Sequence, residues 1–325
     1  MRKELPLENP LIETYQGESF VLAVMMSYKN TRNVVFNNYI NLSTNISTMD
    51  LLRLHFLNST WENYRREGYS SITEYWIRSL EEDSFGDLLR GLIDEDNYLL
   101  VFGVDDFYLP HTELYNKEHN LHDIYLYGYE DDQFMALAYN GNHLSRIMVD
   151  LNNLKKSLFK RKIDENDNVV CSYKVADDVY VDLDINRIIS ELKDYLAGVG
   201  YDSVLEPDKA GVDIYDEIIK ALKKYAKRKR AFFDLRVFRA LWEHKKLMTY
   251  RIAELEPYLP DEELLNRSKE LEGISRKLFL LSMKHSLKND KEDIEEMISI
   301  VETIREKDIA ITTSLIEKLS DSKKP

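Results

Sequence analysis

The sequence predicts an α+β domain over residues 1–200 followed by an all-α bundle over residues 201–325. Three observations support this assignment. Before residue 200, short apolar runs of strand length alternate with helical patterns. The segment GVGYDSVLEPDKAG, at residues 198–211, is rich in Gly, Pro and Asp and is typical of a linker. Beyond it the pattern is almost wholly helical. A chain of 325 residues is long enough for two domains.

Four segments before residue 95 are predicted to form helices. The apolar run FVLAVMM lies between polar segments and indicates a buried helix, and three later segments are also read as helical. Ser47 or Thr48 can cap the second of them. The predicted helices are Ser19–Tyr28, Thr48–Leu57, Ser71–Leu80 and Phe85–Ile93.

The next segment is predicted to form strands. Short apolar and aromatic runs are separated by the turn signals Glu130–Gln133 and Asn140-Gly141, so the second and third strands form a hairpin. Asp150 then caps a helix that runs to Phe159. The predicted strands are 98–104, 123–129, 134–139, 145–149, 169–175 and 179–181, before a helix over 184–196.

Four amphipathic helices are predicted after the linker. Pro257, Pro260 and Asn289 separate three of them. Short connections between helices favour antiparallel neighbours in a bundle. The predicted helices are 213–228, 232–256, 261–287 and 291–319.

Charge and cysteine content limit the classes of function. Lys plus Arg number 44 and Asp plus Glu number 58, so the formal net charge is −14. An acidic chain is poorly suited to nucleic acid or to anionic membranes. Cys171 is the one cysteine and cannot form an internal disulfide, which fits a reducing compartment. No apolar run approaches the ~18 residues of a membrane helix, so we expect a soluble, cytoplasmic protein without nucleic-acid or membrane partners.

Three of the seven histidines, His111, His119 and His122, fall within twelve residues of one another. Asp105 and Asp106 directly follow a predicted strand, and His122 begins the next one. A histidine at a strand start is held rigidly, as a general base requires, although loop histidines are often merely solvated. His119 and His122 have a spacing that would suit a metal on a helix, but the second begins a strand and no third ligand is evident. We expect neither a metal nor a cofactor.

Three segments carry a resemblance to a known family. Gln16-Gly17-Glu18 precedes the apolar run Phe20–Met26, Val104–Pro110 reads VDDFYLP, and His119–Tyr129 leads from His-x-x-His into a strand ending in Tyr-Gly-Tyr. These segments resemble the butirosin biosynthesis protein H-like N-terminal domain, which has the papain-like fold of bacteriocin-processing cysteine peptidases. Two helical segments resemble the C-terminal region of such proteins: Phe233–Arg236 and Glu243–Met248.

The resemblance implies roles for particular residues. The nucleophilic cysteine of the family falls at Gly17, so this chain is a divergent member without that sulfur. The catalytic histidine falls at His122, and Asn140 is the nearest group able to orient its ring. Ser19 could replace the nucleophile, but it is two residues along the helix, about 200° around the axis, so we favour a role as the helix cap. Cys171 is expected to be a small buried residue. The remaining residues assigned to oxyanion or substrate binding are Gln16, Gly17, Glu18 and Asp105.

The resemblance implies two alternative functions. The first is an acyltransferase, thioesterase or amide hydrolase that handles acyl or aminoacyl groups in peptide or aminoglycoside antibiotic biosynthesis. His122 would act as base, and the incoming amine could attack a carrier thioester directly. The second is a pseudoenzyme that keeps the papain-like fold for binding or scaffolding. A metal-dependent hydrolase is a distant third.

A basic run, KALKKYAKRKR, spans Lys220–Arg230 in this acidic chain. Cations at a helix C-terminus complement its dipole and face water, which explains the run without any partner. Alternatively the run binds an acidic partner, for which the resemblance suggests an acyl or peptidyl carrier protein. The residues expected to contact it are Lys223, Lys224 and Lys227. A homodimer is the other assembly we consider.

Overall fold

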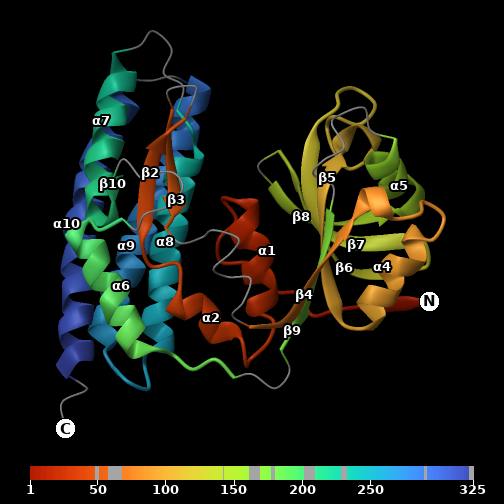
Figure 1. Cartoon of the computed structure of the whole chain (residues 1–325). Coiled ribbons are helices and arrows are strands. Elements are labelled where there is room, and N and C mark those ends of the chain that lie inside the picture. The colour runs from red at the N-terminus through yellow and green to blue at the C-terminus, as the bar shows by residue number, and fades with distance from the viewer. Residues whose placement is uncertain are drawn as a thin grey trace. The chain divides into compact units, whose positions relative to one another are not determined.

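A computed structural model of the chain describes most of its length and groups it into two compact units (Figure 1). Unit 1 consists of Met1–Arg32 and Tyr64–Val181, and unit 2 consists of Asn33–Asn63 and Asp182–Pro325. The predicted α+β class, with antiparallel sheets and helices before a C-terminal helical region, is confirmed. The described residues are 1–47, 51–57, 68–141, 143–160, 169–176, 180–200, 209–227, 233–288 and 291–321.

Unit 1 is built on a seven-stranded antiparallel sheet of order β4-β9-β5-β6-β7-β8, with β1 paired to β6. The predicted β6–β7 hairpin is confirmed and turns between Glu130 and Gln133. Central strands are buried almost continuously, because helices cover both faces of the sheet (Figure 1). The strands are β1 (Arg2–Glu4), β4 (Tyr69–Trp76), β5 (Asn97–Asp105), β6 (Leu121–Glu130), β7 (Gln133–Asn140), β8 (His143–Asp150) and β9 (Val169–Val175).

Among the described residues of unit 1, three α-helices pack on this sheet: α1 (Gln16–Met25), α4 (Phe85–Asp94) and α5 (Leu151–Phe159). Phe20 of α1 stacks on Tyr125 of β6, with ring centroids 5.3 Å apart. Asp150 caps α5 as predicted, because its carboxylate accepts from the N–H groups of Asn152 and Asn153 at 2.9 and 3.2 Å. The 3₁₀ turns η1 (Ile77–Ser79) and η2 (Asp106–Tyr108) follow β4 and β5.

Unit 2 combines a small antiparallel sheet, of order β10-β2-β3, with long helices. α8 contacts β3, and α10 contacts α6, α7 and α9. Gly211 of the turn η4 (Gly211–Asp213) has φ +55°, and a Cβ there would lie 2.0 Å from the Tyr195 carbonyl oxygen, so only glycine fits. The elements are α2 (Arg32–Asn37), β2 (Leu42–Ile46), β3 (Leu52–Phe56), α6 (Ile185–Ala197), β10 (Lys209–Ala210), α7 (Ile214–Ala226), α8 (Arg236–Glu254), α9 (Glu262–Lys288) and α10 (Lys291–Asp321).

Two predicted helices are wrong. The segment assigned to residues 48–57 contains strand β3, whose residues alternate between buried and half-buried, a period of two that the sequence LRLHF also shows. The segment assigned to residues 71–80 is mostly strand β4. Of the strand predicted over 179–181, residue 179 lies outside the described residues, and 180 and 181 are not in a strand. The long helices of the second half are confirmed.

The two compact units do not correspond to the predicted domains, residues 1–200 and 201–325, because each unit combines separate segments of the chain. The segment of residues 33–63 and helix α6 both belong to unit 2, although they lie within the predicted first domain. Arg251 of α8 shows how the early segment is held in unit 2. Its guanidinium is fully buried and donates to the carbonyl oxygens of Phe36 and Asn38. The helical part of the chain therefore includes an early α-β segment in its core.

Candidate functional site at the start of strand β6

The start of α1 is tied to the start of β6 by the half-buried carboxylate of Asp123. Gln16 Nε2 donates to Asp123 Oδ2 at 2.6 Å, and the Gly103 N–H donates to Oδ1 at 2.9 Å. Gly103 lies where the register between β5 and β6 shifts, and its φ of +65° suits glycine. Burial raises the pKa of Asp123, and both hydrogen bonds oppose that rise. The first turn of α1 and the residue next to His122 are thus directly joined.

His122 lies near several ionisable groups. It is paired with Val104 of β5, and its ring meets the Tyr139 ring edge-on, with centroids 6.0 Å apart. Burial raises the pKa of Asp106, and a positive charge on His122 opposes that rise. Burial lowers the pKa of His111, and a positive charge on His122 lowers it further. Within the described ranges, no hydrogen bond joins the His122 ring to a carboxylate or an amide.

Asn140, the residue expected to orient His122, lies at the end of β7. Its Oδ1 accepts from the Glu113 N–H at 3.4 Å, so this oxygen contacts the loop between β5 and β6. The role of Asn140 in orienting His122 therefore stays a prediction, and the contact with Glu113 does not support it.

Ser19 lies inside α1, because the helix begins at Gln16 and Tyr15 occupies the N-cap position. The alternative role of Ser19 as a helix cap is therefore wrong. Its hydroxyl is fully buried, donates to the Gln16 carbonyl at 3.1 Å and accepts from the Tyr139 hydroxyl at 3.1 Å. Through Tyr139 the serine is one side chain away from His122. A nucleophilic role would require the side chain to leave these contacts.

The first turn of α1 also contains Gly17 and Glu18. Gly17 is half-buried, and Glu18 is buried and complements the positive end of the helix dipole. Cys171 is buried in β9, as predicted, and is opposite Glu74 and Leu100 in the sheet. The thiol therefore belongs to the core of the sheet.

A second histidine of this region is oriented by a carboxylate, which the sequence did not reveal. His119 Nδ1 lies 2.7 Å from Asp105 Oδ2, and Asp105 is fully buried. Asp105 Oδ1 accepts from the Phe107 N–H at 3.1 Å, and the Phe107 ring stacks on the imidazole at 4.3 Å. The sequence marked Asp105 for substrate binding and His119 only for a metal. The two residues are fourteen positions apart, so no short motif links them.

The loop between β5 and β6 is closed at its base by a second pair. Asp106 Oδ2 accepts from Asn120 Nδ2 at 2.8 Å, and the Asp106 N–H donates to the Asn120 carbonyl at 2.9 Å. The Thr112 hydroxyl donates to the Asp106 carbonyl at 3.0 Å. In the part of the chain that the structure describes, no group of three or more His, Cys, Asp or Glu residues is arranged to hold a metal ion.

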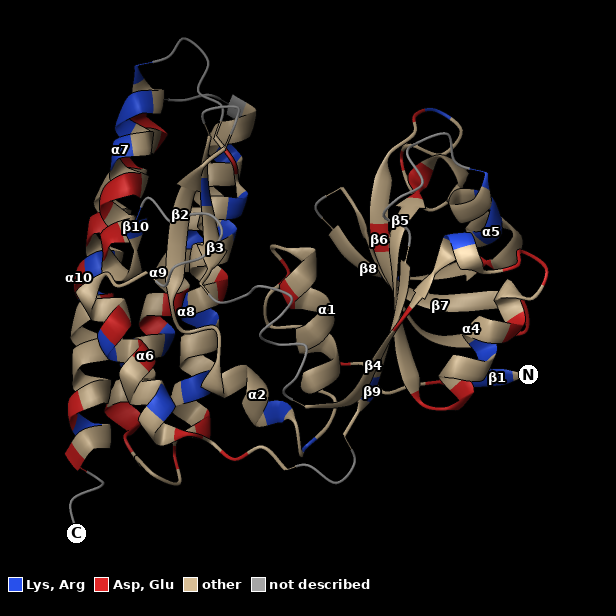
Figure 2. Ribbon diagram, viewed as in Figure 1, with Lys and Arg blue, Asp and Glu red and all other residues tan. Residues whose placement is uncertain are grey.

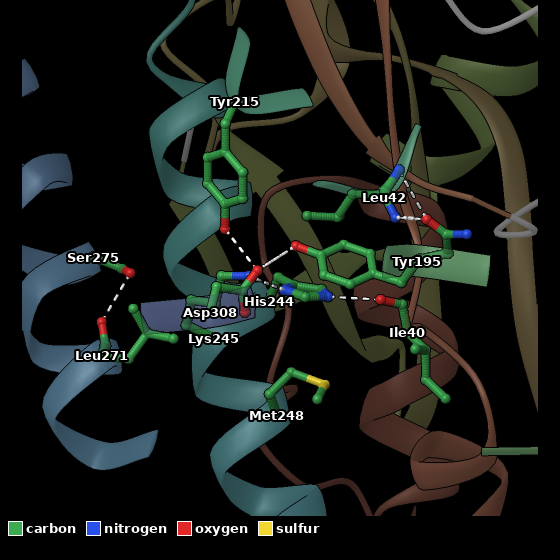
Figure 3. A network of polar contacts seen from close by, with 12 residues as sticks. Ile40, Leu42, Tyr195, Tyr215, His244, Lys245, Met248, Leu271, Ser275 and Asp308 are labelled. Atoms are coloured by element: carbon green, nitrogen blue, oxygen red, sulfur yellow. Dashed lines mark hydrogen bonds and ion pairs between the residues drawn. The ribbon is translucent and has the colours of Figure 1, made fainter. Parts of the chain in front are cut away.

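A different polar cluster is buried in unit 2 (Figure 3). Asp308 of α10 accepts from Lys245 of α8 at 2.8 Å, from Tyr195 of α6 at 2.6 Å and from Tyr215 of α7 at 2.9 Å. His244 Nδ1 lies 3.0 Å from Lys245 Nζ. An ammonium group can only donate, so this nitrogen accepts, and Nε2–H donates to a backbone carbonyl at 2.7 Å.

Burial and the neighbouring Lys245 charge lower the pKa of His244 well below its ordinary value, which keeps the ring neutral. The Lys245 side chain has no exposed area and that of Asp308 is 3% exposed. This cluster joins four helices and is closed to solvent, so it stabilises unit 2 and offers no surface to a substrate.

A groove of about 370 Å³ lies between α7 and the β2–β3 strands of unit 2. Its apolar lining residues are Ile46, Leu52, Ala221 and Tyr225, and its charged ones are Glu217, Lys220 and Lys224. Lys and Arg gather toward the C-terminal end of α7, and acidic residues toward its start (Figure 2). The lysines in and beside the groove are exposed, and Lys220 pairs with Glu217 at 3.1 Å.

Comparison with protein families and with curated proteins finds no match to the sequence. Among the described helices, none combines the length and the apolar character needed to cross a lipid bilayer.

Proposed function

We propose that unit 1 is a divergent papain-like domain that handles acyl or aminoacyl groups in peptide or aminoglycoside natural-product biosynthesis. The observation that carries the proposal is the hydrogen bond from Gln16 to Asp123. It joins the first turn of a helix to the start of the strand that carries His122, and a papain-like site needs this juxtaposition. The resemblance of the surrounding motifs to the butirosin biosynthesis protein H-like domain supports the same assignment.

Direct transfer fits a site with glycine where the family has its cysteine. An acceptor amine attacks the carbonyl carbon of a thioester, and the new N–C bond forms as the C–S bond breaks. His122 takes a proton from the attacking nitrogen, and the departing thiolate takes up a proton. The N–H groups of the first turn of α1, around Gly17, stabilise the oxyanion. No covalent enzyme intermediate is required.

The acyl donor in this proposal is a carrier protein. The groove of unit 2 supports this partner, because exposed lysines border an apolar floor, which suits an amphipathic acidic helix. Lys223 and Lys227 extend the positive charge beyond the groove residue Lys224.

Incubation with acyl- and aminoacyl-loaded carrier proteins and a primary amine tests the function. Mass spectrometry should show transfer by the wild type and a loss of about 10²-fold or more in His122→Ala. His143→Ala, a matched change at an exposed histidine of β8, should transfer at the wild-type rate. Equal transfer by wild type and His122→Ala would exclude catalysis by His122.

The second candidate is a papain-like binding or scaffold protein without catalysis. Gly17 favours it, because the attacking atom is absent, and so does the contact of Asn140 with Glu113. This reading predicts that loaded carriers bind with measurable heat in calorimetry while their acyl groups stay in place, in the wild type and in His122→Ala alike.

A further inference from the structure

We infer that strand β8 of unit 1 is an interaction surface for a second copy of this chain. The two β8 strands pair antiparallel across a two-fold axis at Met148, which joins the two large sheets at their edges. This inference goes beyond the proposed function and does not rest on it. Three features of β8 support it: its position in the sheet, the direction of its backbone groups and the order of its side chains.

β8 is exposed at one end of the seven-stranded sheet (Figure 1). Among the described strands it pairs only with β7, and its residues His143–Asp150 all follow one register without a shift. The side chain of Met148 is 46% exposed. A regular edge strand with open backbone groups is a template for pairing with another strand.

The even-numbered residues of β8 direct their backbone groups away from β7. In an antiparallel pair, successive residues alternate between facing the partner strand and facing outward. The Leu151 N–H, directly after β8, donates to the Asp132 carbonyl at 2.9 Å, so the odd-numbered residues face β7. Arg146, Met148 and Asp150 therefore face the open edge. Two copies with Met148 opposite itself bring these groups together in about six backbone hydrogen bonds.

The side chains of Arg146–Asp150, with the sequence RIMVD, complement the same sequence read in reverse. When Met148 lies opposite its own copy, Arg146 lies opposite the partner's Asp150, and Ile147 lies opposite the partner's Val149. The two-fold axis repeats both pairs, so oppositely charged pairs flank apolar ones. A register with Arg146 opposite itself would bring two guanidinium groups together. The charges therefore favour the register centred on Met148.

The contacts that the two charged residues make within one chain are compatible with this pairing. Arg146 is exposed and donates to the Leu7 carbonyl at 2.5 Å, and a guanidinium has several further N–H donors. Asp150 is half-buried, and its Oδ2 accepts from Gln133 Nε2 at 3.0 Å. A carboxylate oxygen has two lone pairs, so Oδ2 can accept a second hydrogen bond from the partner's Arg146.

The opposite edge of the sheet lacks these features. β4 has a register shift between Tyr69 and Ser71, and such a shift interrupts pairing at an edge. Its one charged residue is Glu74, so two β4 strands would have no opposite charges to match. Charged residues on an edge strand usually prevent self-association. On β8 they are placed so that they attract a second copy.

Sedimentation equilibrium of the full chain tests the inference. The wild type should be a dimer at micromolar concentration. Arg146→Glu places a carboxylate opposite the partner's Asp150 and should raise the dimer dissociation constant about tenfold or more. Asp150→Asn removes the attraction without adding repulsion and keeps a good helix cap, so it should weaken the dimer less. Arg78→Glu, the same charge reversal at an exposed arginine of η1, should leave the dimer unchanged.

Mixing two weakened variants tests the register itself. Arg146→Glu alone and Asp150→Lys alone each bring like charges together in their own dimers. In the mixed dimer, the new carboxylate meets the new ammonium group, and the native Arg146 of one chain meets the native Asp150 of the other. Equimolar mixing should therefore restore the dimer. Thermal melting checks that Asp150→Lys, which loses the cap of α5, remains folded.

A cysteine cross-link gives a test that does not depend on charge. The native Cys171 is buried, so Met148→Cys supplies the accessible thiol. Residues directly opposite in an antiparallel pair have Cα atoms about 5.5 Å apart, within the range of a disulfide. Mild oxidation should give a covalent dimer. Met283→Cys in α9, the same change at a methionine that is 42% exposed, should stay uncross-linked.

Three results would overturn the inference. The first is a wild type with the mass of a single chain at submillimolar concentration, and the second is an Arg146→Glu dimer as stable as that of the wild type. The third is cross-linking of Met148→Cys that is no faster than that of Met283→Cys. A dimer that survives Arg146→Glu and lacks the Met148 cross-link forms through another surface.

Discussion

The substitution Asp308→Asn tests whether unit 2 holds a charged pair in its core. It preserves the shape of the side chain and a carbonyl acceptor for Tyr195 and Tyr215, but removes the negative charge beside Lys245. In the wild type the two charged atoms are 2.8 Å apart, and the side chains are 0% and 3% exposed. Removing one partner of a buried pair leaves an uncompensated charge, at a cost of about 3–5 kcal/mol. We expect that decrease in the free energy of unfolding.

Two further variants calibrate the magnitude. Asp216→Asn makes the same chemical change in an ion pair with Arg305 of α10, 2.7 Å long and with Asp216 58% exposed, so it should cost less than about 1 kcal/mol. Lys245→Met combined with Asp308→Asn removes both charges and should recover most of the loss.

Urea denaturation followed by Trp242 fluorescence reports on unit 2. Trp242 lies in α8 and stacks on Phe279 at 5.7 Å. Substituting the other two tryptophans by phenylalanine isolates its signal from the rest of the chain. Because the units can unfold separately, a local probe is needed. A loss below about 1 kcal/mol for Asp308→Asn, or a double variant that is no more stable than Asp308→Asn alone, would refute the buried charge.

The pH dependence of the same variant gives an independent check. Burial lowers the pKa of Lys245, and Asp308 opposes that effect. Without Asp308, the folded-state pKa falls further below the unfolded value of about 10.4. In that interval the unfolded state binds more protons, so stability rises with pH. Asp308→Asn should therefore regain stability between pH 7 and pH 10, and the double variant should not.

Three other results are expected. In a Gly17→Cys variant, the new cysteine should react with iodoacetamide faster than the buried Cys171. If the imidazole stabilises the thiolate, adding His122→Ala should slow the reaction of the new cysteine about tenfold. Equal rates with and without His122→Ala would contradict the alignment. Substitution of Lys223, Lys224 and Lys227 by glutamate should weaken carrier binding at least tenfold in low-salt calorimetry. Substitution of the exposed Lys269 of α9 by glutamate should leave binding unchanged. Burial lowers the pKa of His244 well below its ordinary value and lowers the pKa of His55 to about 4. As the pH drops from about 6.5 toward 4, these histidines are therefore protonated in the unfolded state before they are protonated in the folded state. The free energy of unfolding should fall over this range. His244→Gln should reduce that slope in urea titrations, and an unchanged slope would remove His244 as its source.

The strongly periodic elements were predictable from sequence. The β6–β7 hairpin has apolar strands on both sides of a polar turn, and the helices after residue 213 have long amphipathic patterns. Strand β3 was missed because its five residues alternate only once or twice, which is too short a pattern to exclude a helix. Tertiary contacts, with α8 covering β3, decide its conformation.

The sites followed the same rule. His122 was identified because a strand start is a local signal. The pairing of Asp105 with His119 depends on how a loop closes, and that of Lys245 with Asp308 joins residues 63 positions apart on different helices. Neither leaves a short motif, because the partners meet only after the chain has folded.

The discontinuous composition of unit 2 has a consequence for synthesis on the ribosome. Strands β2 and β3 emerge early, but the helices that bury Leu54 and Phe56 lie beyond residue 181. Unit 1 can close once β9 has emerged, while the hairpin must wait for most of the remaining chain with its apolar side chains uncovered. A chain shortened to residues 1–181, where unit 1 ends, would keep that exposure permanently and should aggregate, whereas one that lacks residues 33–63 as well should stay dispersed.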